Sequence, residues 1–251
     1  MAVGGREGPR PSASSQIPMD LITFPPLDRF PWLVHGFTTR QEGVDANRPR
    51  GEVITRLGKC HEMVFDTLGI SWESLRLAQQ AHGNKVAVVC ADNLKSEISN
   101  LKSQIPGVDG LVTATAGVPL GIYVADCCAV FLIETRHRAI GLLHSGRRGT
   151  EGNIVRQGIR ELTTLSGGKP SDVVAALSPC IHGCCYDLDF VAQIEQQLRK
   201  EGVEEAWRHP DCTGCHTDRF YSYRKEMGRT GRMLAFAMIR PLPFSPLQGE
   251  E

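Results

Sequence analysis

Three apolar runs of strand length lie close together in the middle of the chain and constrain its fold more than any other feature. They span residues 120–124, 129–133 and 139–143. The first run is followed by Asp126 and Cys127, and the third by His144, a glycine and two arginines. A packed sheet does not select such residues for its own stability. A thiol and an imidazole at neighbouring strand ends are the ingredients of a metal site or a nucleophile site.

Strand-like and helix-like segments alternate along the rest of the chain, which favours a fold of the α/β class with a mixed sheet. Further strands are expected over residues 30–37, 75–80, 85–90, 108–113, 173–177 and 233–239, and the polar stretch 91–105 is expected to hold a short helix. Helical spacing of apolar residues predicts a helix over 53–68 and two more, one capped by Thr150 and one by Asp187 or Asp189. Because Arg147 and Arg148 come just before Thr150, either they bind an anion with the helix end or they form an ordinary surface pair.

The boundaries of the domain follow from composition. Residues 1–20 are rich in Gly, Pro and Ser and are expected to form a flexible N-terminal tail. We expect one catalytic domain over residues 21–245 and a short C-terminal tail over 246–251.

Charge and cysteine content limit the classes of partner and the compartment. The 28 basic and 28 acidic residues give a formal net charge of zero, so the whole chain offers no electrostatic attraction for nucleic acid or an anionic membrane. The nine cysteines are odd in number and occur within apolar strands as well as loops, which predicts reduced thiols in the cytoplasm. We expect a monomer or a weak homodimer.

Three residues are candidate ligands because each follows or ends an expected core strand. They are His82, Cys127 and His144. Two imidazoles and one thiolate suit a catalytic zinc site that keeps a position for water. The same atoms suit a thiol enzyme, with Cys127 as nucleophile, a histidine as base and Asp126 to orient that base. Both interpretations stay open on the residues alone.

The remaining cysteines give a weaker signal. Cys180, Cys184 and Cys185 occur before a single C-x-x-C pair, Cys212 and Cys215, which matches no common zinc knuckle. We therefore interpret these thiols mainly as packing groups, with a separate structural zinc site as the alternative. The eight histidines contain no His-x-His pair, so the supply of ligands for a multicopper centre is poor.

Six motifs together resemble one family. They are HGFTTRQEG (35–43), QQAHGNKV (79–86), VDGLVTATAGVPLGIYVADCCAVFL (108–132), IGLLHSGRRGT (140–150), SPCIHGCCYDLD (178–189), and the FYSYRKE and TGRM sequences at 220–226 and 230–233. In this order they resemble the bacterial laccase-domain proteins, the YfiH-type purine nucleoside phosphorylases related to the human protein FAMIN. The resemblance implies a single-domain layered α/β sandwich, related to cysteine hydrolases of the cytotoxic-necrotizing-factor type.

The resemblance also implies a cofactor and an activity. Zn²⁺ would be bound by His82, Cys127 and His144, and Cu²⁺ belongs to an older attribution of phenol oxidation. The implied reactions are phosphorolysis of adenosine, inosine, guanosine and 5′-methylthioadenosine, with purine nucleoside and phosphate as partners, and hydrolytic deamination of adenosine. The chain departs from the family's HAGWRG motif, because it has Ser145 and Arg147 where the family has alanine and tryptophan.

Roles for other residues follow from position within these motifs. Arg40 and Arg148 are candidates to hold phosphate, since a planar guanidinium suits its oxygens. Asp126 is expected to orient a ligand, and Tyr223 to form a wall of the substrate pocket. Three alternatives compete with the phosphorylase: a Cys–His hydrolase or amidase acting on a peptidoglycan precursor, a copper-dependent phenol oxidase, and a zinc protein without activity.

Overall fold

Two six-stranded sheets form the centre of the structure, a computed structural model that describes residues 20–44, 46, 48–90 and 104–241. The first sheet has the order β1 (Leu21–Ile22), β2 (Leu33–Thr38), β12 (Met233–Ile239), β7 (Leu120–Val124), β3 (Arg76–Gln79), β5 (Gln104–Pro106). The second has the order β11 (Glu205–Arg208), β10 (Val173–Leu177), β8 (Cys128–Glu134), β9 (Ala139–Ser145), β6 (Gly110–Thr113), β4 (Val86–Val88). Each contains parallel and antiparallel pairs, so both are mixed.

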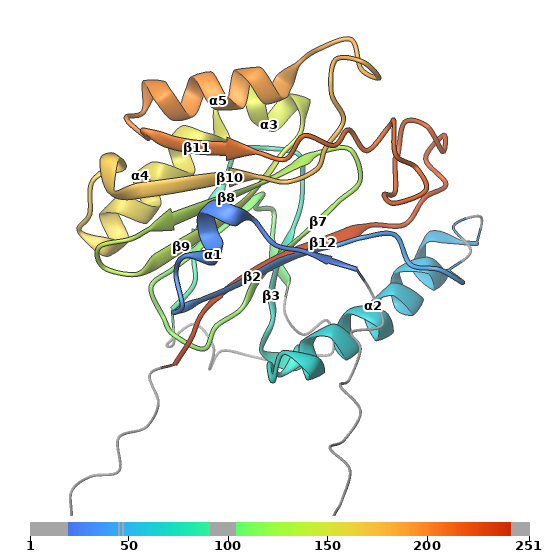
Figure 1. Cartoon of the computed structure of the whole chain (residues 1–251), viewed down its shortest axis with the longest axis horizontal. Coiled ribbons are helices and arrows are strands. Elements are labelled where there is room, and N and C mark those ends of the chain that lie inside the picture. The colour runs from blue at the N-terminus through green and yellow to red at the C-terminus, as the bar shows by residue number, and fades with distance from the viewer. Residues whose placement is uncertain (1–19, 45, 47, 91–103, 242–251) are drawn as a thin grey trace, which may run out of the picture.

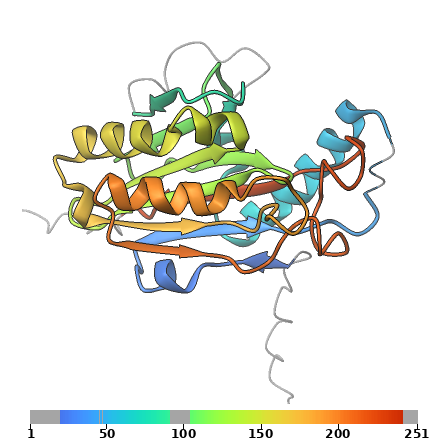
Figure 2. The ribbon, with the colours of Figure 1, turned by 90° about the horizontal axis from the view of Figure 1, so that it is seen from above.

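Helices cover the outer faces of the two sheets (Figure 1 and Figure 2). Besides the short α1 (Pro25–Asp28), they are α2 (Arg50–Thr67), α3 (Arg147–Glu151), α4 (Ile154–Ser166) and α5 (Phe190–Lys200). The helices α4 and α5 lie on the second sheet, and α2 lies beside the first. The predicted layered α/β sandwich is therefore confirmed.

The strand β8 shows why the apolar runs have no polar face. Phe131 and Ile133 belong to the core between the two sheets, whereas Val130 and Leu132 belong to the core under α4 and α5. Successive side chains of a strand point to opposite faces, so a strand covered on both faces is apolar throughout. Cys128 is fully buried in the outer core, as predicted from its position beside Cys127.

The helix expected after Thr150 begins later than predicted. Arg147 and Arg148 lie inside α3, and α4 begins after Asn153, whose side chain accepts a hydrogen bond from the Arg156 backbone N–H. Thr150 instead donates its hydroxyl to the Gly146 carbonyl at 2.9 Å, so it cannot act as the cap. Asn tolerates the left-handed backbone (φ 53°) that restarts the helix at this point.

Other boundaries differ by a few residues. The expected strand over 30–37 begins at Leu33, and Asp189 rather than Asp187 caps α5 through the Ala192 backbone N–H at 3.0 Å. The short strands β1, β5 and β11 have no strong apolar pattern, so they were not predicted from the sequence. Of the polar stretch 91–105, residues 91–103 lie outside the described residues, as do residues 1–19 and 246–251 of the two predicted tails.

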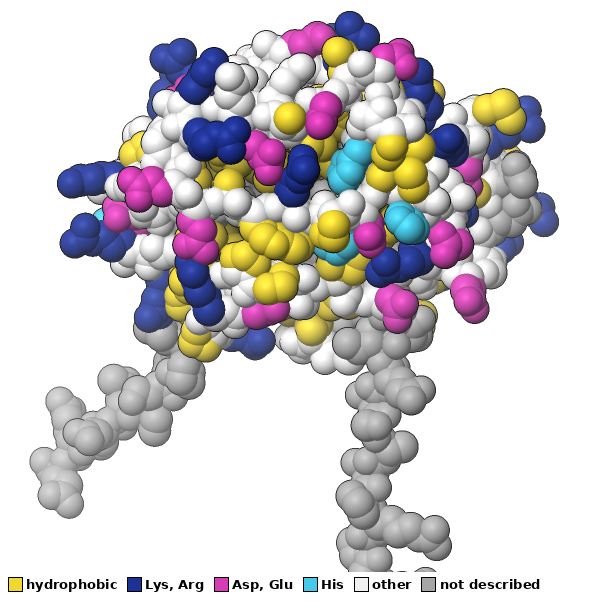
Figure 3. All heavy atoms as spheres, turned by 45° about the horizontal axis from the view of Figure 1, so that its top comes forward, with side chains coloured by type: hydrophobic (Ala, Val, Ile, Leu, Met, Phe, Trp, Pro, Cys, Tyr) yellow, Lys and Arg dark blue, Asp and Glu magenta, His cyan; other side chains and the backbone are white. Residues whose placement is uncertain are grey.

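Surface charge agrees with the balanced composition. On the face shown in Figure 3, basic and acidic side chains alternate and do not gather into a patch of one sign. Among the helices that the structure describes, none has the length and apolar character needed to cross a bilayer.

A buried histidine in α2 gives the fold a predictable dependence on pH. His61 is fully buried, and its ring nitrogens lie 3.2 Å from the hydroxyl oxygens of Thr38 and Tyr123. Burial lowers its pKa to about 3, whereas an unfolded histidine titrates at about 6.5. The unfolded chain therefore binds a proton that the native state excludes, and stability falls as pH drops from 6.5 toward 3.

We expect the His61→Gln variant to lose less stability in acid than the wild type. Between pH 7 and 5 the wild type should lose about 2 kcal/mol more unfolding free energy than the variant, because below pH 6.5 one proton is worth about 1.4 kcal/mol per pH unit. Urea unfolding of both proteins at pH 7, 6 and 5 measures this difference. Equal pH slopes for the two proteins contradict the assignment.

Candidate functional site

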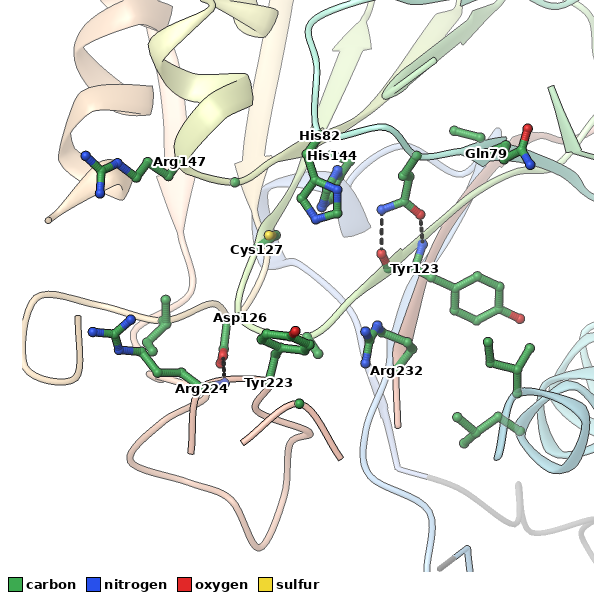
Figure 4. A pocket seen from close by; sticks show the side chains of 18 of the residues that line it. Gln79, His82, Tyr123, Asp126, Cys127, His144, Arg147, Tyr223, Arg224 and Arg232 are labelled. Carbon is green, nitrogen blue, oxygen red and sulfur yellow. Dashed lines mark hydrogen bonds between the residues drawn. The ribbon is translucent and has the colours of Figure 1, made fainter. Parts of the chain in front are cut away.

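The chain passes from the first sheet to the second three times, and two of these crossings carry one candidate ligand each. His82 lies between β3 and β4, and Cys127 lies between β7 and β8. His144 stands near the end of β9, where it pairs with Ala129 of the neighbouring strand. One donor atom from each of His82, Cys127 and His144 lies within 4.8 Å of the other two. The structure thus brings the three predicted ligands together (Figure 4).

Asp109 holds the turn that carries His82. The His82 backbone has a left-handed φ of 60°, a conformation that non-glycine residues seldom adopt unless their surroundings enforce it. The fully buried Asp109 carboxylate accepts hydrogen bonds from the backbone N–H groups of Ala81, His82 and Gly83 at 3.2, 2.9 and 2.7 Å. These bonds satisfy the buried charge and fix the turn.

The same carboxylate orients His144. Asp109 Oδ1 lies 2.8 Å from His144 Nδ1, so this nitrogen donates to the carboxylate and Nε2 is left to bind a metal ion. The orienting role expected of Asp126 from the sequence thus belongs to Asp109, for which no role was predicted. The available signal was a carboxylate at the start of the apolar run of β6, since a buried charge needs fixed partners.

Asp126 has different partners from those expected. Its carboxylate accepts a hydrogen bond from the Thr213 hydroxyl at 2.8 Å and from the Arg224 backbone N–H at 2.7 Å. Its own φ is 78°. Asp126 therefore fixes the Cys127 turn against the segment 211–224, and it acts on the ligand through the backbone.

The pKa values of Cys127 and His144 depend on each other. Burial opposes ionisation of the Cys127 thiol, but hydrogen bonds from His144 and His82 outweigh it and lower the thiol pKa to about 6. Burial likewise disfavours the charged His144 ring, but Asp109 and Cys127 raise its pKa to about 9. Near neutral pH the metal-free group therefore holds a thiolate beside an imidazolium, and a cation that binds there releases the imidazolium proton.

The donors fit a single soft or borderline metal ion. A thiolate and two imidazoles are ligands that Zn²⁺ accepts in tetrahedral sites with one open position. Because Asp109 fixes the His144 ring, the carboxylate supplies the outer partner that metal-bound histidines usually have. His82, Cys127 and His144 would hold the ion, and Asp109 would set the orientation of one imidazole.

The change Asp109→Asn is expected to weaken metal binding by about 10- to 100-fold, as loss of such outer partners typically does. The asparagine amide has the shape of the carboxylate but no negative charge to hold the His144 imidazole. Its NH₂ group is also a hydrogen-bond donor, whereas the carboxylate only accepts. Competition with a chromogenic chelator measures the affinity. Asp172→Asn, in the distant turn before β10, is the control. Equal affinity of the Asp109 variant and the wild type contradicts the role.

A cavity of about 1060 Å³ opens beside the ligand group. Apolar and aromatic side chains share its wall with polar ones, including those of Tyr123, Ile181, Tyr186, Phe190, Gln79 and Gln80. Four large hydrophobic side chains are exposed in the described chain, and three of them, Ile54, Tyr223 and Met227, line this cavity. Exposed apolar surface that gathers at one hollow is typical of a ligand site.

The arginines of the cavity differ from those predicted to hold phosphate. Arg147, Arg224 and Arg232 line it, whereas Arg40 and Arg148 do not. Arg40 lies 2.8 Å from Glu226 and stacks on Tyr221, with 4.4 Å between the guanidinium carbon and the ring centroid.

Arg147 and Arg232 are placed differently on the cavity wall. In Figure 4 the Arg147 guanidinium extends away from Cys127, and Tyr223 and Arg232 lie across the cavity from His82 and His144. Tyr223 stands on the cavity wall, where it was expected. An anion held by Arg232 would therefore face the two imidazoles.

Comparisons with known proteins agree on one family. The sequence model of the family described as multi-copper polyphenol oxidoreductase laccase matches residues 34–189 and 187–240. Purine nucleoside phosphorylase of Deinococcus radiodurans is 32% identical over 84% of this chain and 91% of its own length. Purine nucleoside phosphorylase YlmD of Geobacillus stearothermophilus is 27% identical over 80% of this chain and 83% of its own.

Solved structures show the same fold. The crystal structure of YlmD from Geobacillus stearothermophilus matches with a TM-score of 0.75 at 26% identity, over 84% of this chain and 93% of that one. The Bacillus licheniformis hypothetical protein YfiH also gives a TM-score of 0.75, at 22% identity, over 90% of this chain and 98% of that one.

The copper chemistry in the family description does not fit the described donors. In the parts of the chain that the structure describes, only two groups of side chains are arranged to hold a metal, the cavity group and a group of four cysteines. The two contain only two histidines between them, which is too few for a centre of several copper ions.

Proposed function

Because the chain belongs to the laccase-domain family whose sequence model matches most of its length, we propose that it is a zinc-dependent purine nucleoside phosphorylase. Its proposed substrates are adenosine, inosine, guanosine and 5′-methylthioadenosine, each with phosphate. We propose in addition that it deaminates adenosine and that it acts in the cytoplasm. The observation that carries the proposal is the convergence of His82, Cys127 and His144 on the wall of the large cavity, in a chain whose curated relatives are named purine nucleoside phosphorylases.

The wall of the cavity suits both substrates. A purine needs a flat apolar surface, and Tyr223 supplies an exposed aromatic ring at the wall. Phosphate needs a planar cation, and Arg232 supplies one across from the imidazoles. Arg232 also donates to the backbone carbonyls of Thr230 and Gly231 at 3.3 and 2.7 Å, which positions its guanidinium.

Phosphorolysis requires phosphate to lie beside the sugar carbon while the bond from that carbon to the purine breaks. The sugar carbon gains positive charge in the transition state, so a fixed anion beside it is favourable. Holding both substrates in one cavity makes their encounter intramolecular. When bound, the metal would supply Lewis-acid polarisation of an oxygen atom. Asp109 keeps His144 in one tautomer throughout.

A nucleoside panel with and without phosphate tests the proposal. Chromatography of the products should show release of free purine base and of the sugar 1-phosphate, ribose 1-phosphate or, from 5′-methylthioadenosine, 5-methylthioribose 1-phosphate, that depends strictly on added phosphate. Ammonia should be released from adenosine whether or not phosphate is present. Base release that is independent of phosphate, or no turnover of any nucleoside by zinc-loaded protein, contradicts the phosphorylase.

The change Arg232→Ala is expected to raise the KM for phosphate about 10-fold or more, because hydrogen bonds to charged groups are worth about 1.5–3 kcal/mol. Steady-state rates at varied phosphate and saturating inosine measure it. Arg148→Ala is the matched control, since Arg148 is exposed and lies outside the cavity lining. If Arg148→Ala raises the KM for phosphate more than Arg232→Ala does, phosphate binds at Arg148, as predicted from the sequence.

One observation favours a second candidate, the Cys–His hydrolase acting on a peptidoglycan precursor. Cys127, His144 and Asp109 are linked in the order nucleophile, base and orienting carboxylate, which is the arrangement of thiol enzymes. The hydrolase predicts full activity after chelation and permanent loss after alkylation of Cys127. The phosphorylase predicts loss on chelation and recovery when Zn²⁺ is returned.

A further inference from the structure

Four cysteine sulfurs gather in a second group, outside the cavity wall. Cys184 and Cys185 come from the loop after β10, and Cys212 and Cys215 come from the loop after β11. All four sulfur atoms lie within 4.8 Å of one another, and all four residues are free thiols. The Cys215 sulfur lies 3.4 Å from that of Cys184 and 3.5 Å from that of Cys185.

The backbone around these thiols is built for close approach. A side chain at Gly214 would place its Cβ atom 2.8 Å from the Cys185 Cβ atom, so only glycine admits Cys185 at this distance. The His182 backbone N–H donates to the Cys212 sulfur at 3.3 Å. The Thr213 backbone N–H donates to the Cys180 carbonyl at 3.0 Å, which ties the two loops together.

Packing does not account for this group. Cys184 and Cys215 are exposed and Cys185 is only partly buried, whereas thiols that fill space in a core are withdrawn from water. The sequence interpretation as packing groups therefore holds for the buried Cys180 and not for these residues. A disulfide would use only two of the four sulfurs and would need an oxidant.

We propose that Cys184, Cys185, Cys212 and Cys215 bind one Zn²⁺ ion as a tetrahedral tetrathiolate site, separate from the cavity group. Four thiolates close the coordination shell, which is typical of structural zinc and leaves no position for water. The binding step exchanges four thiol protons, which pass to solvent, for one Zn²⁺ ion. No electron transfer occurs.

The proposed ion would fix the wall of the cavity. The loop that begins at Cys212 continues through Thr213, which donates to Asp126, to Tyr223 and Arg224 on the cavity wall. The loop of Cys184 and Cys185 continues to Tyr186, which also lines the cavity. One metal ion would therefore join two loops that lie outside the named helices and strands.

Metal analysis of the full chain tests the proposal. After dialysis, mass spectrometry should find two zinc ions per chain in the wild type, one in Cys127→Ser, and one in the double variant Cys184→Ser/Cys215→Ser. The triple variant should hold none. Cys60→Ser, which removes a partly buried thiol outside both groups, should keep two. One zinc in the wild type and none in Cys127→Ser overturns the site.

Three further measurements, one of them on the wild type, cover a variant that fails to fold. In the Cys127→Ser chain, Co²⁺ should give the charge-transfer and visible bands of a tetrathiolate, and the single change Cys215→Ser should weaken Zn²⁺ binding about 100-fold. In the wild type, the four thiols should react with a thiol reagent only after a strong chelator is added. Immediate reaction of Cys184 and Cys215 in zinc-loaded protein, or a disulfide between them in the purified chain, overturns the proposal.

Discussion

Changing Cys127 to serine is expected to lower kcat/KM for inosine phosphorolysis about 1000-fold, which corresponds to about 4 kcal/mol of transition-state stabilisation. A serine hydroxyl stays protonated at neutral pH, so it replaces a thiolate with a weak neutral donor. The remaining ligands, His82 and His144, cannot hold the ion with two imidazoles alone. The variant should stay folded, because the sulfur lies at the cavity and is only partly buried.

The control is the adjacent thiol. Cys128 is fully buried in the outer core, so Cys128→Ala should lose about 1 kcal/mol of stability and keep its activity and its cavity metal. Circular dichroism and metal content accompany the rate measurement for both variants. Full activity of Cys127→Ser in a preparation that has lost one zinc ion per chain relative to the wild type contradicts the metal-dependent mechanism.

Removal of the metal ion with a chelator distinguishes the two enzyme classes in which Cys127 could act. Both the metal enzyme and the thiol hydrolase lose activity when the sulfur is removed, so the substitution alone does not distinguish them. Removal of the ion leaves the thiolate of Cys127 beside the imidazolium of His144, which is the active form of a thiol nucleophile. The metal enzyme is inactive in that state and the hydrolase is not.

The sequence predicts the central strands well because both of their faces are buried. The runs at 120–124, 173–177 and 233–239 coincide with β7, β10 and β12 to the residue. A strand inside two cores is apolar at every position, and polar residues therefore mark its ends sharply. Edge strands such as β11 are half-exposed and carry no such signal.

The site is predictable only in part, for a related reason. His82, Cys127 and His144 were predicted because they lie at the ends of expected strands. Nothing in their sequence spacing shows that two of them lie where the chain crosses from one sheet to the other. The role of Asp109 was not predicted, because it depends on three backbone N–H groups of a turn that is distant in the sequence. The phosphate candidates failed to reach the cavity because α3 directs Arg148 to solvent and Glu226 binds Arg40.

The same tight packing makes Gly146 a sensitive position. An added Cβ atom there would lie 2.5 Å from the Cys127 sulfur, well inside van der Waals contact. The backbone itself accepts a side chain, because Gly146 has the extended conformation φ −96°, ψ −173°. The clash is therefore confined to one sulfur at the end of a short side chain, which can rotate away at a cost of about 1 kcal/mol.

Gly146→Ala is accordingly expected to leave stability nearly unchanged and to lower metal affinity and kcat/KM about 100-fold or more, since a displacement of about 1 Å at a reacting centre has that effect. Chelator competition, steady-state rates and urea unfolding measure the three quantities. Gly83→Ala is the matched control beside the other ligand turn, because its Cβ atom meets only Asp109 Oδ2 at an ordinary 3.5 Å. If both alanine variants keep wild-type metal affinity, the Cys127 sulfur does not need the position it has here, and the ligand geometry on which the function rests is wrong.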